Sequence, residues 1–188
     1  SSDKDICLMD RTPYMDRFEV VSVSFPGTGG WWPVMDPYDP SFVASLEKQL
    51  IDRKRELEDP WCLGFFVDNE IAWGHPTNIA EIVIKCPADQ AAKKHFLSVL
   101  KGKYGTINAL NKAWGTKFAS WNALADNRKA VKTNDKNRAD YLEFNRGVIH
   151  KYYSNIRGAF DRLAPGVLYM GCRFAGYTPD LVSIGAEY

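Results

Sequence analysis

The chain has 188 residues, a formal net charge of +1 and 13% aromatic residues, which suits one globular unit with a substantial core. Lysines and arginines are interspersed with acidic residues, so neither a nucleic-acid partner nor an anionic membrane is expected, and a neutral partner is favoured. No apolar stretch approaches the roughly twenty residues that span a bilayer, and the first residues lack the pattern of a signal peptide. The four cysteines are widely spaced and expected to be free thiols, and neither a metal ion nor a cofactor is predicted.

The first predicted element is an extended segment from Arg17 to Phe25, whose valines and phenylalanines are typical of a β-strand. It leads into a glycine-rich stretch, residues 26–33, that resembles a phosphate-binding loop in composition only. Such a loop opens directly onto a helix, whereas here Trp31, Trp32 and a proline intervene. Nucleotide binding is therefore not predicted.

A helix is predicted over residues 39–58, because an aspartate cap and a first-turn proline precede apolar residues at helical spacing. After a break of two residues, a strand is predicted over residues 61–67. Its almost continuous apolar run indicates a parallel strand buried on both faces. Asp68, Asn69 and Glu70 follow at once. At the carboxyl end of such a strand they predict a catalytic rim, with capping of the next helix as the alternative.

Beyond this triplet the chain is expected to be mainly helical. Helices are predicted over residues 89–100 and 106–114, and both are expected behind the sheet. Residues 125–137 are rich in polar side chains without an apolar period and predict a solvated loop or helix end. The longest helix is predicted over residues 138–163, where apolar residues recur every three to four positions.

The last part of the chain returns to the sheet. Residues 167–174 predict a second apolar strand, which places Arg173 at its carboxyl end. A threonine cap and a first-turn proline then predict a helix over residues 178–188, with a strand over residues 181–184 as the alternative.

The order of strand, helix, strand, helices, strand and helix predicts an α/β fold with right-handed crossovers and a parallel sheet. Only about three strands are predicted, whereas an eight-stranded βα barrel typically needs about 250 residues. Residues 1–188 are therefore expected to be one piece of a single, larger catalytic domain.

Three stretches carry a resemblance to known enzymes. They are Asp59-Pro60-Trp61 running through Asp68-Asn69-Glu70 to Trp73-Gly74, residues 103–116 (KYGTINALNKAWGT), and residues 168–174 (LYMGCRF). Together they resemble the β-agarases of glycoside hydrolase family 50 and, more distantly, the family 42 β-galactosidases, which are retaining glycosidases built on TIM barrels. The resemblance implies that this chain is a partial (β/α)8 barrel, roughly strands three to five with their helices.

The resemblance also implies roles for two neighbouring residues. Glu70, at the end of the fourth barrel strand, would be the general acid/base, and Asn69 would hold the sugar hydroxyl next to the scissile bond. The chemistry agrees, because a glycosidic oxygen leaves poorly until it is protonated, and the apolar run before Glu70 disfavours a charged carboxylate. The family nucleophile is a glutamate on the seventh strand, outside this chain. Glu187 is expected to be structural, and this piece alone is expected to be inactive.

Two tryptophans on the glycine-rich loop, Trp31 and Trp32, are candidate platforms for a sugar ring, with packing of the loop as an equal alternative. Trp73, three residues after Glu70, is a stronger candidate for lining the cleft. His75 is a weaker candidate for contacting substrate or Glu70, since a histidine beside a proline can simply satisfy a loop carbonyl.

Arg173, at the other strand end, is a candidate for orienting Glu70 or a sugar hydroxyl, with an ion pair to Asp68 as the alternative. No metal ligands are assigned.

The predicted function is part of a retaining glycoside hydrolase that cleaves β-galactosidic bonds in agarose or related algal galactans. The alternatives are a β-galactosidase acting on short glycosides and a noncatalytic carbohydrate-binding barrel module. A polysaccharide or oligosaccharide is the expected partner, and family likeness favours a secreted or periplasmic protein. If the polypeptide stops here, the incomplete barrel is expected to self-associate through its open strand edges.

Overall fold

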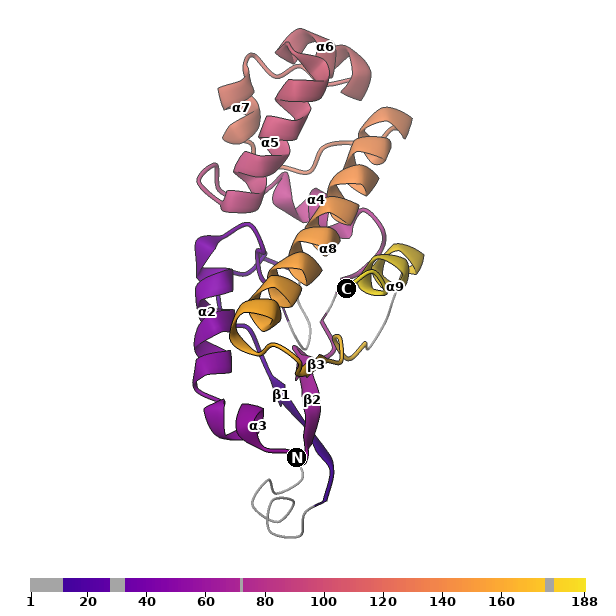
Figure 1. The fold of residues 1–188 in the computed structure, drawn as a ribbon. Coiled ribbons are helices and arrows are strands. Elements are labelled where there is room, and N and C mark those ends of the chain that lie inside the picture. The colour runs from indigo at the N-terminus through magenta and orange to yellow at the C-terminus, as the bar shows by residue number, and fades with distance from the viewer. Residues whose placement is uncertain (1–11, 28–32, 72, 175–177) are drawn as a thin grey trace.

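The computed structural model describes residues 12–27, 33–71, 73–174 and 178–188 (Figure 1). Its elements, in chain order, are β1 (Tyr14–Phe18), α2 (Pro40–Ile51), α3 (Lys54–Glu58), β2 (Cys62–Val67), α4 (Asn78–Val83), α5 (Ala91–Tyr104), α6 (Ile107–Trp114), α7 (Trp121–Ala125), α8 (Asp135–Leu163), β3 (Leu168–Tyr169) and α9 (Pro179–Gly185).

The three strands form one parallel sheet in the order β1-β2-β3. The chain passes from β1 to β2 through α2 and α3, and from β2 to β3 through a helical segment that ends with α8. The predicted alternation of strands and helices and the parallel pairing are therefore confirmed. Because all three strands run the same way, their carboxyl ends meet at one edge of the sheet.

Helices α2 and α8 pack together and cover one face of the sheet (Figure 1). At the centre of this layer the ring of Phe65 on β2 lies 6.1 Å from that of Phe18 on β1 and 6.3 Å from that of Phe160 on α8, measured between centroids. All three side chains are essentially inaccessible to solvent. This aromatic contact fixes the strands beneath the helices.

The helix predicted over residues 39–58 is divided in two. Asp39 caps α2 as expected, since its carboxylate accepts from the Ser41 amide at 2.9 Å, but α2 ends at Ile51 and the short α3 follows. At the break, the guanidinium of Arg53 lies 4.9 Å above the Phe18 ring and 3.5 Å from Asp16. Arg53 thus contacts β1 at the two-residue break between α2 and α3.

Both outer strands differ from their predicted ranges. β1 begins before Arg17 and ends at Phe18; beyond it, only an isolated bridge at Ser24 continues the predicted segment. β3 covers two residues, Leu168–Tyr169, and Gly171 two residues beyond it adopts a left-handed backbone with φ of +85°. Backbone bonds to β2 continue past that point, and Arg173 still pairs with Asn69.

The expectation that residues 89–100 and 106–114 lie behind the sheet is wrong. The helices they form, α5 and α6, pack with α7 and the first part of α8, at the end of the molecule opposite α3 (Figure 1). The reason is length: α8 has 29 residues and extends about 43 Å, whereas a strand of six residues extends about 20 Å. The apolar side of α8 that extends beyond the sheet must therefore be buried by other helices.

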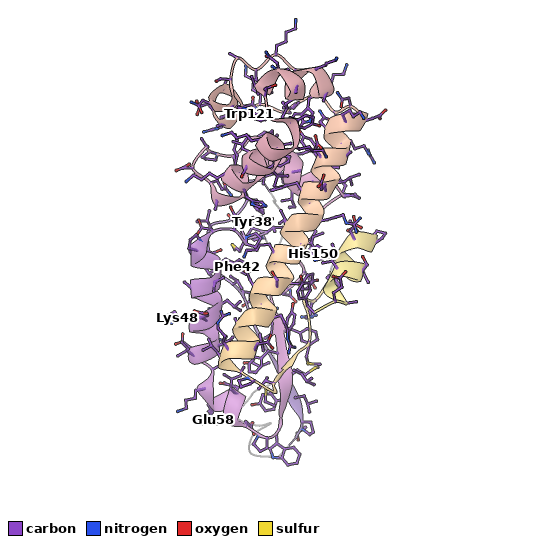
Figure 2. All side chains as sticks on the ribbon, turned by 45° about the horizontal axis from the view of Figure 1, so that its top comes forward. Tyr38, Phe42, Lys48, Glu58, Trp121 and His150 are labelled. Atoms are coloured by element: carbon purple, nitrogen blue, oxygen red, sulfur yellow. The ribbon has the colours of Figure 1, made fainter. Side chains whose placement is uncertain are left out.

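The helices that bury this part of α8 pack around aromatic side chains. The Phe96 and Phe144 rings stack 4.2 Å apart, and the Trp114 ring meets Tyr141 edge-on at 5.5 Å. We call α4 to α7 with the first half of α8 the helical half, and the strands with α2, α3, α9 and the second half of α8 the sheet half. Figure 2 shows Trp121 at the end of the helical half and Glu58 at the opposite end of the molecule.

The remaining helical predictions have mixed outcomes. The helix after Thr178 is confirmed as α9, with Leu181 and Ile184 buried, so the alternative strand is excluded. The long helix begins at Asp135 rather than Arg138, because Asn134 forms a capping box with Asn137. The short α4 was not predicted; its apolar residues span too few positions to show a helical period.

The cysteines of the described ranges, Cys62, Cys86 and Cys172, are free thiols as predicted, and Cys7 lies outside those ranges. Within the same ranges, no helix combines the length and apolar character that crossing a bilayer requires.

Candidate active site

The segment after β2 has a strained backbone. Asp68 and Glu70 both adopt left-handed conformations, with φ of +62° and +50°, which cost a non-glycine residue on the order of 1–3 kcal/mol each. The next helix, α4, begins at Asn78 and is preceded by Thr77 as its cap. The alternative that Asp68, Asn69 and Glu70 cap the following helix is therefore excluded. Strained residues of this kind cluster at functional sites.

Neighbouring strands hold this segment on both sides. The Asp68 amide donates to the carbonyl of Phe18 at the end of β1, and the Glu70 amide donates to the carbonyl of Arg173, both at 2.8 Å. Asn69 forms a parallel bridge with Arg173. The structure thus brings Asn69, Glu70 and Arg173 together at the carboxyl edge of the sheet.

Asp68 is buried, and both of its carboxylate oxygens are occupied. Oδ1 accepts from the Val20 amide at 2.7 Å and Oδ2 accepts from the Tyr152 hydroxyl at 2.8 Å. Burial raises the pKa of Asp68 to about 6, although both hydrogen bonds act in the opposite direction. Among the described residues no ion pair joins Asp68 to Arg173, whose side chain is exposed.

Asn69 is the side chain best placed to meet a ligand. It is only 6% exposed, yet its Oδ1 atom is buried without a hydrogen-bond partner. It lines a pocket of about 220 Å³ with Asp68, Glu19 and several apolar residues. A buried acceptor left unpaired costs about 1–3 kcal/mol, a cost that a hydroxyl group donating to it would remove.

Glu70 is half-buried beside Asn69 at this edge. Its backbone amide is tied to the carbonyl of Arg173, so the carboxyl-bearing side chain is attached to a fixed point of the sheet.

Trp73 is less open than the sequence indicates. Its side chain is 4% exposed and its ring meets the Tyr152 ring edge-on at 5.3 Å, while its Nε1 atom is buried without a partner. The indole is therefore packed against α8 and offers at most its N–H to a ligand. Its contact with substrate stays a prediction. Trp31 and Trp32 lie outside the described residues.

His75 has other neighbours than those predicted. Its Nδ1 lies 3.2 Å from the Thr77 hydroxyl and its Nε2 lies 3.7 Å from a Glu81 carboxylate oxygen. These contacts tie the exposed imidazole to the start of α4, where a hydroxyl and a carboxylate replace the loop carbonyl of the alternative interpretation. A substrate contact by His75 stays a prediction.

Tyr152 was not identified from the sequence as a site residue. It belongs to the apolar stripe of α8, where a tyrosine is normally a core residue, and it is 1% exposed. Its approach to Asp68 joins positions 84 residues apart, which no local pattern reports. The only available signal was a buried hydroxyl that needed a partner.

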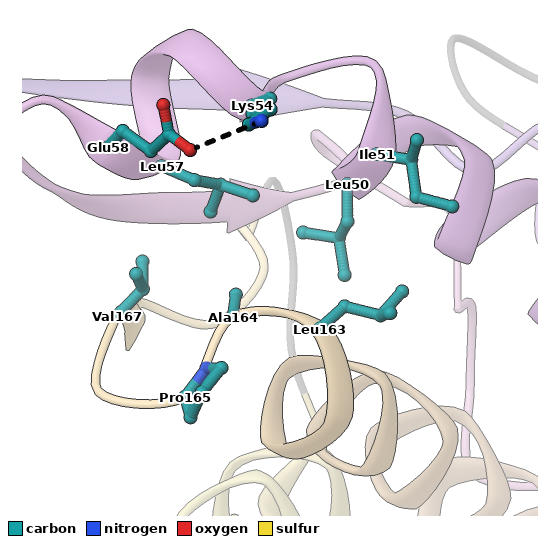
Figure 3. Close-up of a pocket in the computed structure, with 9 residues that line it drawn as sticks. All are labelled: Leu50, Ile51, Lys54, Leu57, Glu58, Leu163, Ala164, Pro165 and Val167. Carbon is teal, nitrogen blue, oxygen red and sulfur yellow. Dashed lines mark ion pairs between the residues drawn. The ribbon is translucent and has the colours of Figure 1, made fainter.

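A larger hollow, of about 400 Å³, lies at the opposite end of the sheet (Figure 3). It separates α2 and α3 from the end of α8, with Leu50, Leu57 and Leu163 among its lining residues and the Lys54–Glu58 pair, at 3.6 Å, on its rim. It lies near the amino ends of β2 and β3, whereas parallel sheets bind ligands at the carboxyl ends of their strands. The smaller pocket beside Asn69 is therefore the candidate site.

A family model described as beta-galactosidase, glycoside hydrolase family 42, matches residues 41–181. The chain belongs to this glycoside hydrolase family. Among curated relatives, it is 37% identical over 180 residues to Beta-agarase B of Vibrio sp. (strain JT0107), covering 86% of this chain and 18% of the relative. It is 31% identical over 188 residues to Beta-agarase A of the same organism, covering 91% and 18%. This glycoside hydrolase chain thus spans about a fifth of the length of these relatives.

Two solved structures resemble the fold of this glycoside hydrolase chain over nearly its whole length. An agarase, AgWH50C, superposes with a TM-score of 0.85 at 30% identity, covering 97% of this chain and 28% of the agarase. An exo-beta-agarase superposes with the same TM-score at 28% identity, covering 100% and 28%. The resemblance to family 50 β-agarases drawn from the sequence motifs is confirmed.

Proposed function

We propose that the chain is the acid/base-bearing part of a retaining glycoside hydrolase that cleaves β-galactosidic bonds in agarose or related galactans. The observation that carries this proposal is the strained carboxyl end of β2. There a half-buried Glu70 follows an Asn69 whose buried oxygen has no partner. The β-agarase relatives and the agarase structures support the choice of substrate.

In the complete enzyme, the three parallel strands would be strands three to five of a (β/α)8 barrel. Active sites of that fold lie at the carboxyl ends of the strands, where Asn69, Glu70 and Arg173 are found. The large share of the agarase structures outside the aligned region leaves room for the other strands.

The proposed reaction consists of two displacements. Glu70 protonates the glycosidic oxygen while a carboxylate outside this chain attacks the anomeric carbon, and Glu70 then takes a proton from water as the glycosyl-enzyme is hydrolysed. The two carboxyl groups of a retaining enzyme lie about 5–5.5 Å apart. Asn69 accepts a hydrogen bond from the sugar hydroxyl beside the scissile bond. Glu187, which follows α9 and lies 3.9 Å from His150 on α8, keeps a structural role in this proposal.

The test uses the complete enzyme that contains this chain, with Glu70→Gln compared on two substrates. Agarose oligosaccharides need a proton on the leaving oxygen, whereas an aryl glycoside with an acidic phenol needs little help. We expect kcat/KM to fall about 10²- to 10⁴-fold on the oligosaccharide. On the aryl glycoside, kcat/KM should fall far less. Equal losses on both substrates would exclude Glu70 as the acid.

A second candidate, a β-galactosidase acting on short glycosides, is favoured by the description of the matching family. Turnover of an aryl β-galactoside without release of products from agarose would select it. Binding of agaro-oligosaccharides, measured by tryptophan fluorescence, with no product from either substrate would instead select a noncatalytic carbohydrate-binding module.

The proposed partner is a galactan chain, and the proposed location is outside the cytoplasm, where a polymer of this size is met. Export of the complete protein is checked by assaying agarose hydrolysis in culture medium and in a periplasmic extract.

A further inference from the structure

The Asp68 carboxylate connects three separate elements. Asp68 follows β2. Its carboxylate accepts one hydrogen bond from the Val20 amide, just beyond β1, at 2.7 Å and another from the Tyr152 hydroxyl on α8 at 2.8 Å. Its own amide donates to Phe18 at 2.8 Å. Asp68 is therefore held through both its backbone and its side chain, immediately before Asn69 and Glu70.

Tyr152 is itself immobilised by aromatic neighbours. Its ring meets Phe42 of α2 at 5.7 Å, Trp73 at 5.3 Å and Tyr153 at 5.1 Å, all edge-on. Because the ring is packed against these three neighbours, the side chain cannot shift, and the hydroxyl oxygen at its end keeps one position. The direction of the bond to Asp68 is therefore determined by the core of the sheet half.

We propose that Asp68 and Tyr152 form a positioning pair, in which the buried hydrogen bond holds the left-handed strand end and thereby sets the directions of Asn69 and Glu70. The proposal rests on the proposed function of Glu70. Neither member of the pair needs to touch the substrate. The pair acts because a left-handed backbone reverts to an extended one when its anchors are removed.

Protonation of Asp68 should loosen the pair, because a neutral carboxyl accepts hydrogen bonds less strongly. The titratable groups around it are Glu19 beyond β1, which raises its pKa, Tyr152 on α8, whose hydrogen bond lowers it, and Tyr169 and Cys172 on the β3 segment. The pKa of about 6 places loosening on the acidic side of neutrality. Removing the Tyr152 hydroxyl should move that loosening to higher pH.

The helical half contains a matched control. Asp140 is also buried, and it accepts from the Tyr104 hydroxyl at 2.7 Å and from the Trp114 indole at 2.6 Å. It lies within the regular α8 helix. Tyr104→Phe therefore removes the same kind of bond as Tyr152→Phe, but from a carboxylate that does not carry the strand end.

The experiment compares Tyr152→Phe, Asp68→Asn and Tyr104→Phe in the complete enzyme, measuring Tm and the pH dependence of kcat and kcat/KM on agaro-oligosaccharides. For Tyr152→Phe we expect kcat to fall about 10- to 100-fold, the equivalent of one hydrogen bond to a charged group, with KM changed less than about threefold. The acidic limb of kcat/KM should move to higher pH. Asp68→Asn should lower kcat and remove any acidic limb that belongs to Asp68. Tyr104→Phe should lower Tm while leaving kcat and the pH profile unchanged.

If Tyr152→Phe lowers Tm as Tyr104→Phe does but keeps the kcat and pH profile of the parent enzyme, the positioning role is overturned. Should Asp68→Asn fail to fold, Tyr152→Phe still decides, because phenylalanine keeps the ring and its packing. Glu70→Gln in the same series separates the two proposals. An inactive Glu70→Gln beside a fully active Tyr152→Phe rejects the pair alone, whereas an active Glu70→Gln rejects the proposed function and the pair with it.

Discussion

The two halves of the molecule each bury a carboxylate beneath an aromatic donor, but they place it on different kinds of backbone. Asp140 lies within a regular helix and joins α8 to α5 and α6 through Tyr104 and Trp114. Asp68 lies on a left-handed backbone at a strand end. In the helical half these hydrogen bonds hold packed helices together. In the sheet half they hold a strained backbone in place. We therefore expect substitutions in the helical half to change stability, and substitutions at the strand end to change catalysis.

The largest effect on stability is expected from Asp140→Ala. The change leaves the hydroxyl of Tyr104 and the buried N–H of Trp114 without an acceptor and breaks the 2.7 Å ion pair to Lys103. Two lost bonds to a charged acceptor correspond to about 3 kcal/mol or more. The free energy of unfolding, measured by urea titration of the complete enzyme, checks this value. A kcat that falls as steeply as stability would contradict the separation of the two halves.

Lys93 offers a second test in the helical half. Its buried ammonium donates to the carbonyls of Ile84, Cys86 and Asn127 at 3.1, 2.8 and 2.8 Å, and so ties the end of α4 to the loop before α8. Lys93→Met keeps most of the packing but leaves three carbonyls without this donor, which we expect to cost about 2 kcal/mol. Urea titration at pH 7 measures the loss, and Lys94→Met, at the exposed neighbouring position, is the control.

The pH dependence of stability provides a sharper signature of Lys93. Burial lowers its pKa to about 8, below the ordinary value of 10.5. Between these values the unfolded chain binds more protons than the folded one, so this residue makes stability rise as the pH increases from about 8 to 10.5. The rise should be absent in Lys93→Met. A slope in this window that is identical in the two proteins would show that Lys93 is not the group responsible.

At the strand end the opposite pattern is expected from Asn69→Ala. Removing its unpaired Oδ1 atom relieves the desolvation cost of that atom, which offsets the packing lost with the buried side chain. The free energy of unfolding should therefore change by less than about 1 kcal/mol. Turnover should fall, because the bond to the sugar hydroxyl strengthens in the transition state. Measuring kcat and KM separately checks this role. A change confined to KM would show uniform binding instead of transition-state stabilisation.

An association test addresses the exposed faces of the sheet half. Met15 and Leu63 are each 49% exposed and Leu168 is 60% exposed. Among the residues that the structure describes, the outer edges of β1 and β3 have no further strand beside them. Residues 1–188 produced alone are therefore expected to form oligomers or aggregates. Size-exclusion chromatography with light scattering measures the mass. A stable monomer would show that the open edges are covered in some other way.

The strand–helix order and the polar end of β2 could be predicted from the sequence because both depend on neighbouring residues. The continuous apolar run to Val67 correctly indicated a strand, although the predicted burial on both faces is wrong, since Leu63 is 49% exposed. A capping aspartate with a proline correctly indicated a helix after Asp39. The position of α5 and α6 could not be predicted, because it follows from the length of α8 relative to the sheet. The Asp68–Tyr152 hydrogen bond could not be predicted either, because it joins residues 84 positions apart in the sequence.

The smallest and most selective effect is expected from Glu70→Asn. Glutamate at φ of +50° is strained, whereas asparagine tolerates the left-handed region better than other non-glycine residues. We therefore expect the free energy of unfolding to rise by about 0.5–1 kcal/mol, while activity is lost because the shorter amide cannot donate a proton to the glycosidic oxygen. Ala113→Asn, on a regular helix, is the control and should not stabilise. A stabilised, inactive Glu70→Asn would show that this backbone is held in its conformation at a cost in stability. A destabilised variant would instead show that Glu70, like Asp140, stabilises the fold.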